Sequence, residues 1–298
     1  GLPLPDLWFG LVFFIFGTFL FLDGFDFGAG LLFATRADEQ EREQFLAAIG
    51  PFWDGNEVWL VVFGGALFAA FPAVYANLFS RHYLLMFAIL GWSGRAFVVG
   101  SIAAPFFLGM FTANWLVGAT TTITLPAVVV GLTVVALTVV DGVAFLRLKT
   151  RGDVRADLRM AGYQSLVAYL VLVVVTLGYV YVGVPTLRAQ LLSPLVVALV
   201  AVTLLFAVVY AAATRFDRYY VAFAAAAGLV YTLVSIVASL MYPQVDPAVA
   251  LTVETAIVST IPLNIMSIGA ALLLPLVFVY FIVLYSAFSG PIEAGESY

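Results

Sequence analysis

Two pairs of acidic residues interrupt stretches that are otherwise long and apolar enough to cross a membrane. Asp23 and Asp26 lie within the apolar run 7–33. Asp54 and Glu57 stand at the start of the next apolar run. A charged side chain at bilayer depth costs at least about 2.5–3.5 kcal/mol, so acids in such places usually line ion or proton paths. We therefore expect the chain to help move protons inside a membrane complex.

The composition determines the fold class. Hydrophobic residues make up 64% of the 298 residues and charged residues only 10%, whereas a soluble domain is roughly 45–50% apolar and about 25% charged. Apolar runs of about 20 residues recur along the chain, and a bilayer offers no water to satisfy their backbone groups, so they must be helices. The sequence predicts an all-α polytopic membrane protein, with residues 1–298 forming a single integral-membrane domain.

Because the chain lacks certain residue types, several kinds of binding site are excluded. It has no cysteine and one histidine, His82, which excludes disulfides, iron–sulfur clusters and a haem with two histidine ligands from this chain alone. We expect no metal site, and we expect His82, beside Arg81, to be an ordinary residue of the outer membrane surface. The first apolar run lacks a positively charged segment before it, which favours a retained helix over a signal peptide.

Eight apolar segments are long enough to span a bilayer, and one further segment is ambiguous. The expected spans are 7–34, 57–79, 96–117, 122–146, 162–183, 194–213, 219–242 and 262–288. The segment 83–117 allows two interpretations: either it is one overlong helix, or it holds two helices with almost no loop between them.

The distribution of charge favours two helices, because cytoplasmic loops collect Lys and Arg. With nine spans, Arg81 and Arg188 lie on one side of the membrane and nine basic residues on the other, whereas eight spans divide them eight against three. The nine are Arg36, Arg42, Arg147, Lys149, Arg151, Arg155, Arg159, Arg215 and Arg218. We therefore predict about nine transmembrane helices, with the N-terminus outside and the C-terminus in the cytoplasm.

A short internal echo predicts how these helices are grouped. Residues 22–27 read Leu-Asp-Gly-Phe-Asp-Phe and residues 140–145 read Val-Asp-Gly-Val-Ala-Phe, each with an arginine further on. Both segments end spans that run in the same direction in the nine-span arrangement. We interpret the echo as a pseudo-repeat of 1–118 and 119–242, which gives two four-helix bundles plus one peripheral helix at 262–288.

The acids near the end of the first span have two interpretations. Asp23 and Asp26 are three residues apart, so they share roughly one helix face, among Gly24, Gly28 and Gly30. The glycines are typical of close helix packing, in which the acids would simply bond to neighbouring helices. Packing does not require a carboxylate, however, so we favour a proton path or a contact with quinone for Asp23, and we keep Asp26, nearer the cytoplasmic end, as a further candidate for the proton path.

Asp54 and Glu57 also have a structural and a functional interpretation. Pro51 suits an early helical position and an acid in the first turn favours the helix dipole, so the segment could be no more than a helix start. Alternatively, Asp54 is a proton-uptake group that faces water, and Glu57 receives the proton from it. Arg95, if it lies inside the membrane, is a candidate partner for the buried acids.

The remaining charged residues are expected at the membrane surfaces. Asp141 lies within about two turns of a basic loop, so it should extend to the surface or pair with Arg147. Segment 36–44 mixes both signs of charge and is expected to be a solvated turn. Asp246 and Glu254, in the longest outer loop, are expected to be exposed.

The same residues carry a resemblance to a known family. The chain resembles subunit II of the cytochrome bd-type quinol oxidases essentially from end to end, and the stretch from Trp53 to Tyr75 is the most specific part. The matching segments are 23–30 (Asp-Gly-Phe-Asp-Phe-Gly-Ala-Gly), 53–59 (Trp-Asp-Gly-Asn-Glu-Val-Trp), 64–75, 100–101, 146–150, 242–243 and 263–266.

The resemblance implies a nine-helix subunit that pairs with a larger subunit I of similar architecture. In that family subunit I carries the haems, of types b and d, and the quinol site, whereas subunit II carries no haem. The complex oxidises quinol, reduces dioxygen to water and takes its protons from the cytoplasm. On this resemblance Asp23 and Asp54 belong to a proton route towards the haems. A structural quinone and small single-helix accessory subunits are further partners that the resemblance suggests.

The chain departs from the family pattern at one junction, and other functions remain open. Residues 90–96 join the third and fourth helical segments almost directly, where family members usually have a longer helix and a polar loop. Phe52 also stands where many members have another residue. The main alternative is a subunit of an ion or proton transporter or channel, because glycine-interrupted helices with buried acids also build ion sites. A purely structural stabiliser of subunit I is a third possibility.

Overall fold

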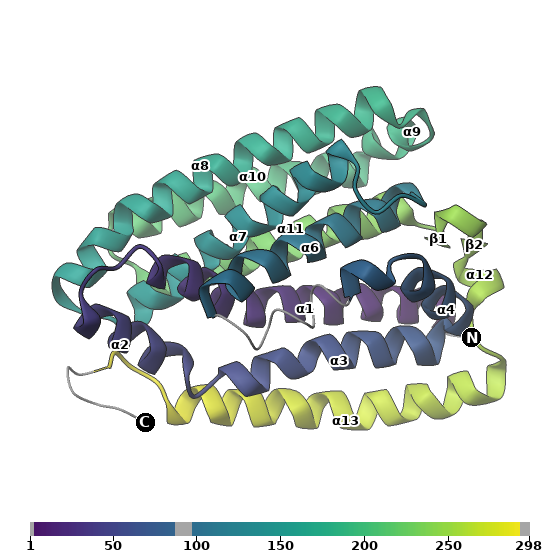
Figure 1. Cartoon of the computed structure of the whole chain (residues 1–298). Coiled ribbons are helices and arrows are strands. Elements are labelled where there is room, and N and C mark those ends of the chain that lie inside the picture. The colour runs from purple at the N-terminus through teal and green to yellow at the C-terminus, as the bar shows by residue number, and fades with distance from the viewer. Residues whose placement is uncertain (1–2, 87–96, 293–298) are drawn as a thin grey trace.

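The computed structural model describes residues 3–86 and 97–292, and most of them lie in helices that run along one common axis (Figure 1). Seven helices within these ranges are long and apolar enough to cross a membrane, which confirms the all-α polytopic fold. They are α1 (Leu4–Phe33), α6 (Phe97–Val117), α7 (Leu125–Lys149), α8 (Gly152–Gly183), α10 (Pro194–Arg215), α11 (Tyr219–Met241) and α13 (Thr260–Ala287). The count of nine spans stays a prediction, because residues 87–96 lie outside the described ranges.

The predicted span 57–79 is wrong as one continuous helix. The structure divides it between α3 (Trp53–Ala70) and α4 (Pro72–Arg81). Phe71, between them, has a ψ of 64°, which lies outside the helical range. Pro72 lacks the N–H that would continue the hydrogen-bond ladder of α3. The apolar run therefore continues, but the helix does not.

The charged segment after α1 is a helix rather than the solvated turn expected at 36–44. α2 (Glu39–Ile49) begins after Asp38, whose carboxylate accepts a hydrogen bond from the backbone N–H of Gln40. Such a cap satisfies a donor that the first helical turn leaves free. The buried face of α2, which includes Phe45, packs against the neighbouring ends of α1 and α7.

The opposite end of the bundle carries the remaining short elements. η1 (Pro185–Leu187) and α9 (Arg188–Leu191) connect α8 to α10. Four elements connect α11 to α13, and the two strands among them pair antiparallel. They are β1 (Gln244–Asp246), η2 (Pro247–Val249), β2 (Leu251–Thr252) and α12 (Val253–Ala256).

The expectation that Asp246 is exposed is wrong, although Glu254 is exposed as predicted. Asp246 is fully buried, and its two carboxylate oxygens accept hydrogen bonds of 3.0 and 2.8 Å from the guanidinium of Arg81. The pairing arises because β1 folds back against α4. A buried acid with a bidentate arginine partner is a structural device that fixes this loop.

α1 lies at the centre of the bundle, in contact with α3, α6, α7 and α11. Two glycines allow α1 and α7 to approach closely. A Cβ on Gly28 would lie 1.9 Å from the carbonyl oxygen of Thr138, and a Cβ on Gly142 would lie 2.6 Å from the carbonyl carbon of Gly28. No side chain fits at these distances, so the crossing requires glycine on both helices. It also brings Asp141 of α7 against Gly24 of α1.

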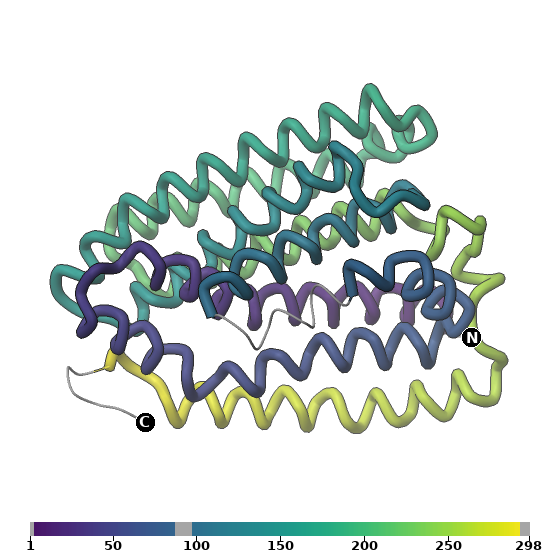
Figure 2. Tube along the Cα trace, in the orientation of Figure 1, coloured from purple at the N-terminus to yellow at the C-terminus, as the bar shows by residue number. Residues whose placement is uncertain are grey.

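α13 is the most exposed of the seven long helices. Of its residues only Leu263 is buried, and Figure 2 shows the helix lying along the outside of α3. Aromatic contacts hold it there: the ring centroids of Trp59 and Phe281 are 5.6 Å apart, and those of Phe52 and Tyr285 are 4.4 Å apart. The outer face of α13 is apolar, which suits contact with lipid or with another subunit.

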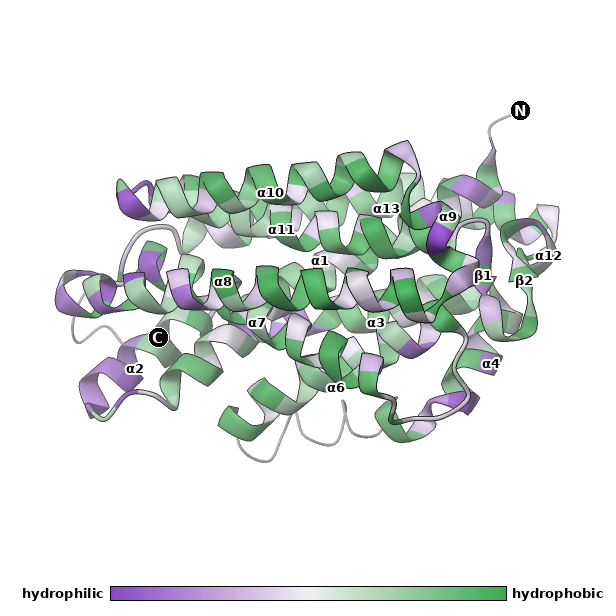
Figure 3. Ribbon diagram, turned by 90° about the horizontal axis from the view of Figure 1, so that it is seen from above, coloured by the Kyte–Doolittle hydropathy of each residue, from purple (hydrophilic) through white to green (hydrophobic). Residues whose placement is uncertain are grey.

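Hydrophilic residues gather at the two ends of the bundle, and the middles of the helices are apolar (Figure 3). One end is formed by α2, the start of α8 and the turn between α10 and α11. All nine basic residues predicted to share one side of the membrane lie in or beside these segments. Arg81 and Arg188 lie at the other end.

Candidate functional site

The two acids of α1 lie in a deeply buried part of the helix, next to a small cavity. Asp23 and Asp26 are each 3% exposed. They line a cavity of about 40 Å³ together with Glu57 of α3 and Ser101 of α6. Most of the other wall residues are apolar, and a space of this size is large enough for about one or two water molecules beside the polar side chains. The structure therefore brings three of the four predicted proton-path acids to one water-sized space.

Asp26 also begins a chain of hydrogen bonds that leads to α13. The side-chain amide of Asn56 donates to Oδ2 of Asp26 at 2.8 Å, and the hydroxyl of Tyr285 donates to Oδ1 of Asn56 at 2.9 Å. Asn56 is fully buried. Within the described residues Oδ1 of Asp26 has no hydrogen-bond partner. One oxygen of this carboxyl is thus held in place while the other is left available.

Asp54 lies apart from the other three acids. It is in the first turn of α3 and is exposed, as is Glu57 one turn later. Glu57 nevertheless lines the cavity and interacts electrostatically with Asp23. Asp54 does not appear among the residues of the cavity wall. The geometry makes Glu57 the residue between the exposed helix start and the buried acids.

The structure overturns the interpretation of Asp141 as a surface residue paired with Arg147. Asp141 is fully buried, and neither of its carboxylate oxygens has a hydrogen-bond partner within the described residues. Sequence distance to the basic loop was misleading because the end of α7 is itself buried. The echo between residues 23–24 and 141–142 was the signal that could have drawn attention to this acid.

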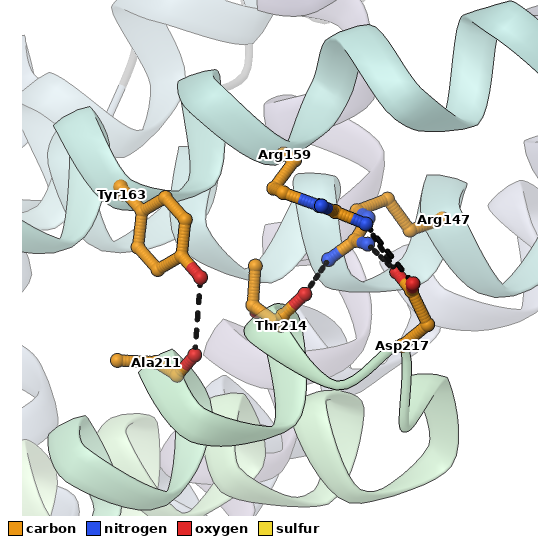
Figure 4. A network of polar contacts seen from close by, with 6 residues as sticks. All are labelled: Arg147, Arg159, Tyr163, Ala211, Thr214 and Asp217. Carbon is orange, nitrogen blue, oxygen red and sulfur yellow. Dashed lines mark hydrogen bonds and ion pairs between the residues drawn. The ribbon is translucent and has the colours of Figure 1, made fainter.

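Arg147 instead belongs to a polar network at the basic end of the bundle (Figure 4). Its guanidinium donates to Oδ1 of Asp217 at 2.7 Å and to the carbonyl oxygen of Thr214 at 3.4 Å. Arg159 of α8 donates to both oxygens of Asp217, at 2.8 and 3.0 Å. Desolvation acts to raise the pKa of Asp217, but the hydrogen bond and charge of Arg159, followed by those of Arg147, outweigh it and lower the pKa.

His82 and Arg95 were also singled out in the sequence, and neither belongs to the site as the structure describes it. His82, expected at the membrane surface, is fully buried with its ring edge-on to Phe111 at 5.9 Å between centroids. Arg95, the candidate partner of the buried acids, lies outside the described residues. Within the described ranges no arginine or lysine forms an ion pair with the acids of α1 and α7.

These features define a class of protein: a polytopic helical membrane protein whose central helices carry buried carboxyls beside a water-sized cavity. The family follows from comparison with known proteins. The model of the cytochrome bd terminal oxidase subunit II family matches residues 4–92 and 91–288, and the chain belongs to this family. It is therefore a component of a quinol oxidase complex. The two matched stretches meet at 91–92, within the shortened junction noted in the sequence.

Individual relatives agree with the family model. The cytochrome bd ubiquinol oxidase subunit 2 of Bacillus subtilis is 31% identical over 318 residues, which cover 92% of each chain. The cytochrome bd-I ubiquinol oxidase subunit 2 of Escherichia coli is 48% identical over 86 residues, 28% of this chain and 22% of that protein. A chain in the structure of bd oxidase from Geobacillus thermodenitrificans shares the fold, with a TM-score of 0.76 over 96% of this chain and 98% of that one, at 16% identity.

Proposed function

We propose that this chain is the haem-free subunit II of a prokaryotic respiratory quinol:dioxygen oxidoreductase and that it supplies carboxylates to the uptake of protons for the reduction of dioxygen to water. The observation that carries the proposal is the cavity of about 40 Å³ bordered by Asp23, Asp26 and Glu57. Acids at membrane depth are costly and usually mark ion or proton paths, and the cavity beside them is large enough for water.

The proposed route starts at the exposed first turn of α3. Asp54 takes up a proton from water, and Glu57, on the next turn, passes it to the cavity. Asp23 and Asp26 receive the proton on the far side of the cavity. Each acid loses and regains one proton, so the chain itself is unchanged after each transfer.

The haems belong in a partner subunit. The chain has one histidine and no cysteine, so it cannot supply two histidine ligands or a cysteine thiolate ligand to a haem from its own residues. We propose a heterodimer in which a larger subunit I holds haem b and haem d, which supply the electron transfer and dioxygen chemistry. A face of α3 suits this partner, because Val58, Val61 and Phe68 are 53%, 74% and 59% exposed on it.

The experiment is to replace Asp54 by Asn in the whole oxidase complex and to measure quinol oxidation by dioxygen. Removal of a proton-transfer group should slow turnover by about tenfold or more. Asp38→Asn is the matched control, because Asp38 is an exposed acid near the same end and Asn serves equally well as a helix cap. A complex that contains Asp54→Asn, has its haems and turns over at the rate of the unsubstituted enzyme excludes Asp54 from the route. If Asp23→Asn is equally without effect, the proton role of this chain fails.

A further inference from the structure

Asp141 is a third buried acid that the route above does not use. It is fully buried in α7 and neither of its oxygens has a partner within the described residues. An ionised carboxylate in such surroundings costs several kcal/mol, whereas an apolar side chain would pack there at no such cost. The presence of an acid at the contact of α1 and α7 therefore points to chemistry rather than to packing.

The ionisable groups that interact with Asp141 are carboxyl and phenol groups, which carry no positive charge. Arg147, the nearest cation further along α7, directs its guanidinium to the turn between α10 and α11. Within the described residues, then, no cation compensates a negative charge on Asp141, and the neutral carboxyl is the form that fits. The groups that interact with it electrostatically are Asp26 of α1, Tyr210 of α10, Tyr231 of α11 and Tyr285 of α13.

Asp141 faces the helix that carries the acids of the cavity. Its Oδ2 lies 3.3 Å from the position that a Cβ on Gly24 would take, so the glycine leaves room for the carboxyl against α1. Asp26, half a turn further along α1, has an oxygen that is likewise buried and unpartnered. Its other oxygen is fixed by Asn56. Two buried carboxyls with unpartnered oxygens thus interact electrostatically, and of the two only Asp26 lines the cavity.

We propose that Asp141 and Asp26 hold protons as a pair, in which Asp141 is a proton store for the uptake route. This inference rests on the proposed function. The two carboxyls are not hydrogen-bonded to each other, so the transfer needs a water molecule from the cavity as a bridge. When Asp26 gives its proton to the cavity, this water gives a proton to Asp26 and takes the proton of Asp141: the O–H bond of Asp141 breaks, an O–H bond forms on Asp26 and the negative charge passes to Asp141. A proton that arrives later from the cavity reverses the transfer.

The pair should keep its last proton to a higher pH than a lone carboxyl would. The charge left by the first ionisation opposes the second, so the two carboxyls titrate as one coupled unit. Turnover in alkaline conditions, where protons from water are scarce, should therefore depend on Asp141 more than turnover in acid conditions does.

Asp141→Asn in the whole oxidase complex tests this, because Asn keeps the shape of the side chain and removes the exchangeable proton. The alkaline limb of the pH profile for quinol oxidation by dioxygen should move to lower pH by about one unit, with turnover at acid pH little changed. Thr138→Val is the matched control: Thr138 lies one turn earlier on α7, also beside Gly24, and its hydroxyl donates only to the carbonyl oxygen of Val135. Its pH profile should not move.

An Asp141→Asn complex with full haem absorbance and an unmoved alkaline limb overturns the proton store. If that variant does not assemble, infrared spectra of the unsubstituted and Asp26→Asn complexes decide. The substitution should remove one protonated-carboxyl band and shift a second, and a second band that stays in place overturns the proposal. Slow turnover of Asp54→Asn, together with an unmoved pH profile of Asp141→Asn, refutes only the proton store. Normal turnover of both Asp54→Asn and Asp23→Asn refutes the uptake route itself.

Discussion

The aspartates of this molecule fall into two groups, those bound by arginine and those buried without a cation partner. At the ends of the bundle, Asp217 and Asp246 are each bound by arginine, at distances of 2.7 to 3.0 Å. Inside the bundle, Asp23, Asp26 and Asp141 are buried and form no ion pair with a cation among the described residues. Acids that only fix a loop are well served by a bidentate partner. The proton transfer that we propose for the buried acids requires the absence of such a partner, since a bound arginine would keep them ionised.

The Asp217 network predicts a pH-dependent contribution to stability. The pKa of Asp217 is lowered in the folded chain, so its contribution is complete above the ordinary aspartate pKa of about 3.9 and is lost as the pH falls through the lower folded value. Asp217→Asn should lower the thermal midpoint of the purified complex at pH 7, and the difference from the unsubstituted complex should shrink below about pH 4. Asn tolerates the positive φ of 54° at this position.

Asp157→Asn is the control for this prediction. Asp157 is 64% exposed and lies 3.6 Å from Arg36, and exposed ion pairs contribute little. A midpoint difference for Asp217→Asn that is no larger than that for Asp157→Asn, or one that grows on acidification, would contradict the role given to the network.

The acids of α1 could be recognised from the sequence, but their companion on α7 could not. A spacing of three residues places Asp23 and Asp26 on one face, and their position inside an apolar run already indicates burial. The environment of Asp141 depends on a helix crossing set by residues more than a hundred positions away. Arg147, expected as its partner, binds Asp217, which follows it by 70 residues. Local spacing carries no information about such pairings.

The long helices could be predicted from the sequence, whereas the break between α3 and α4 and the short helix α2 were missed. Apolar runs predicted the seven long helices because a bilayer leaves the backbone no other choice. Hydropathy alone ran α3 and α4 together, although Pro72 marks the break. It also hid α2, whose many charges obscure the short apolar face around Phe45. Proline and capping residues carried the missing information at both places.

The crossing of α1 and α7 predicts which glycine is indispensable. Gly28→Ala would place a methyl group 1.9 Å from a backbone oxygen of α7, so the helices must separate. The thermal midpoint of the complex should fall by about 5 °C or more, with a lower yield of assembled, haem-containing complex. Gly178→Ala is the control, because nothing lies within 4 Å of that position on α8 and alanine is the better helix former. Equal midpoints for the two variants would show that the close approach does not hold the bundle together.

The whole molecule has two chemically different ends, and that difference predicts its orientation in the membrane. The basic residues at the end with α2 are what the cytoplasmic face of a membrane protein collects. The water-exposed start of α3, which we propose as the uptake point, lies near the same end. The proposed uptake of protons from the cytoplasm therefore agrees with the orientation that the basic residues predict.

Accessibility from outside the cell tests this orientation, and the chain suits the experiment because it contains no cysteine. Gln40→Cys lies on the exposed surface of α2, and Thr121→Cys lies on the exposed loop at the opposite end. A membrane-impermeant maleimide should label Thr121→Cys in intact cells and Gln40→Cys only after the cells are opened, and the unsubstituted chain serves as the blank. Labelling of Gln40→Cys in intact cells would place the basic end outside. Uptake through Asp54 would then draw protons from the wrong side of the membrane, and the proposed route would have to be abandoned together with the orientation.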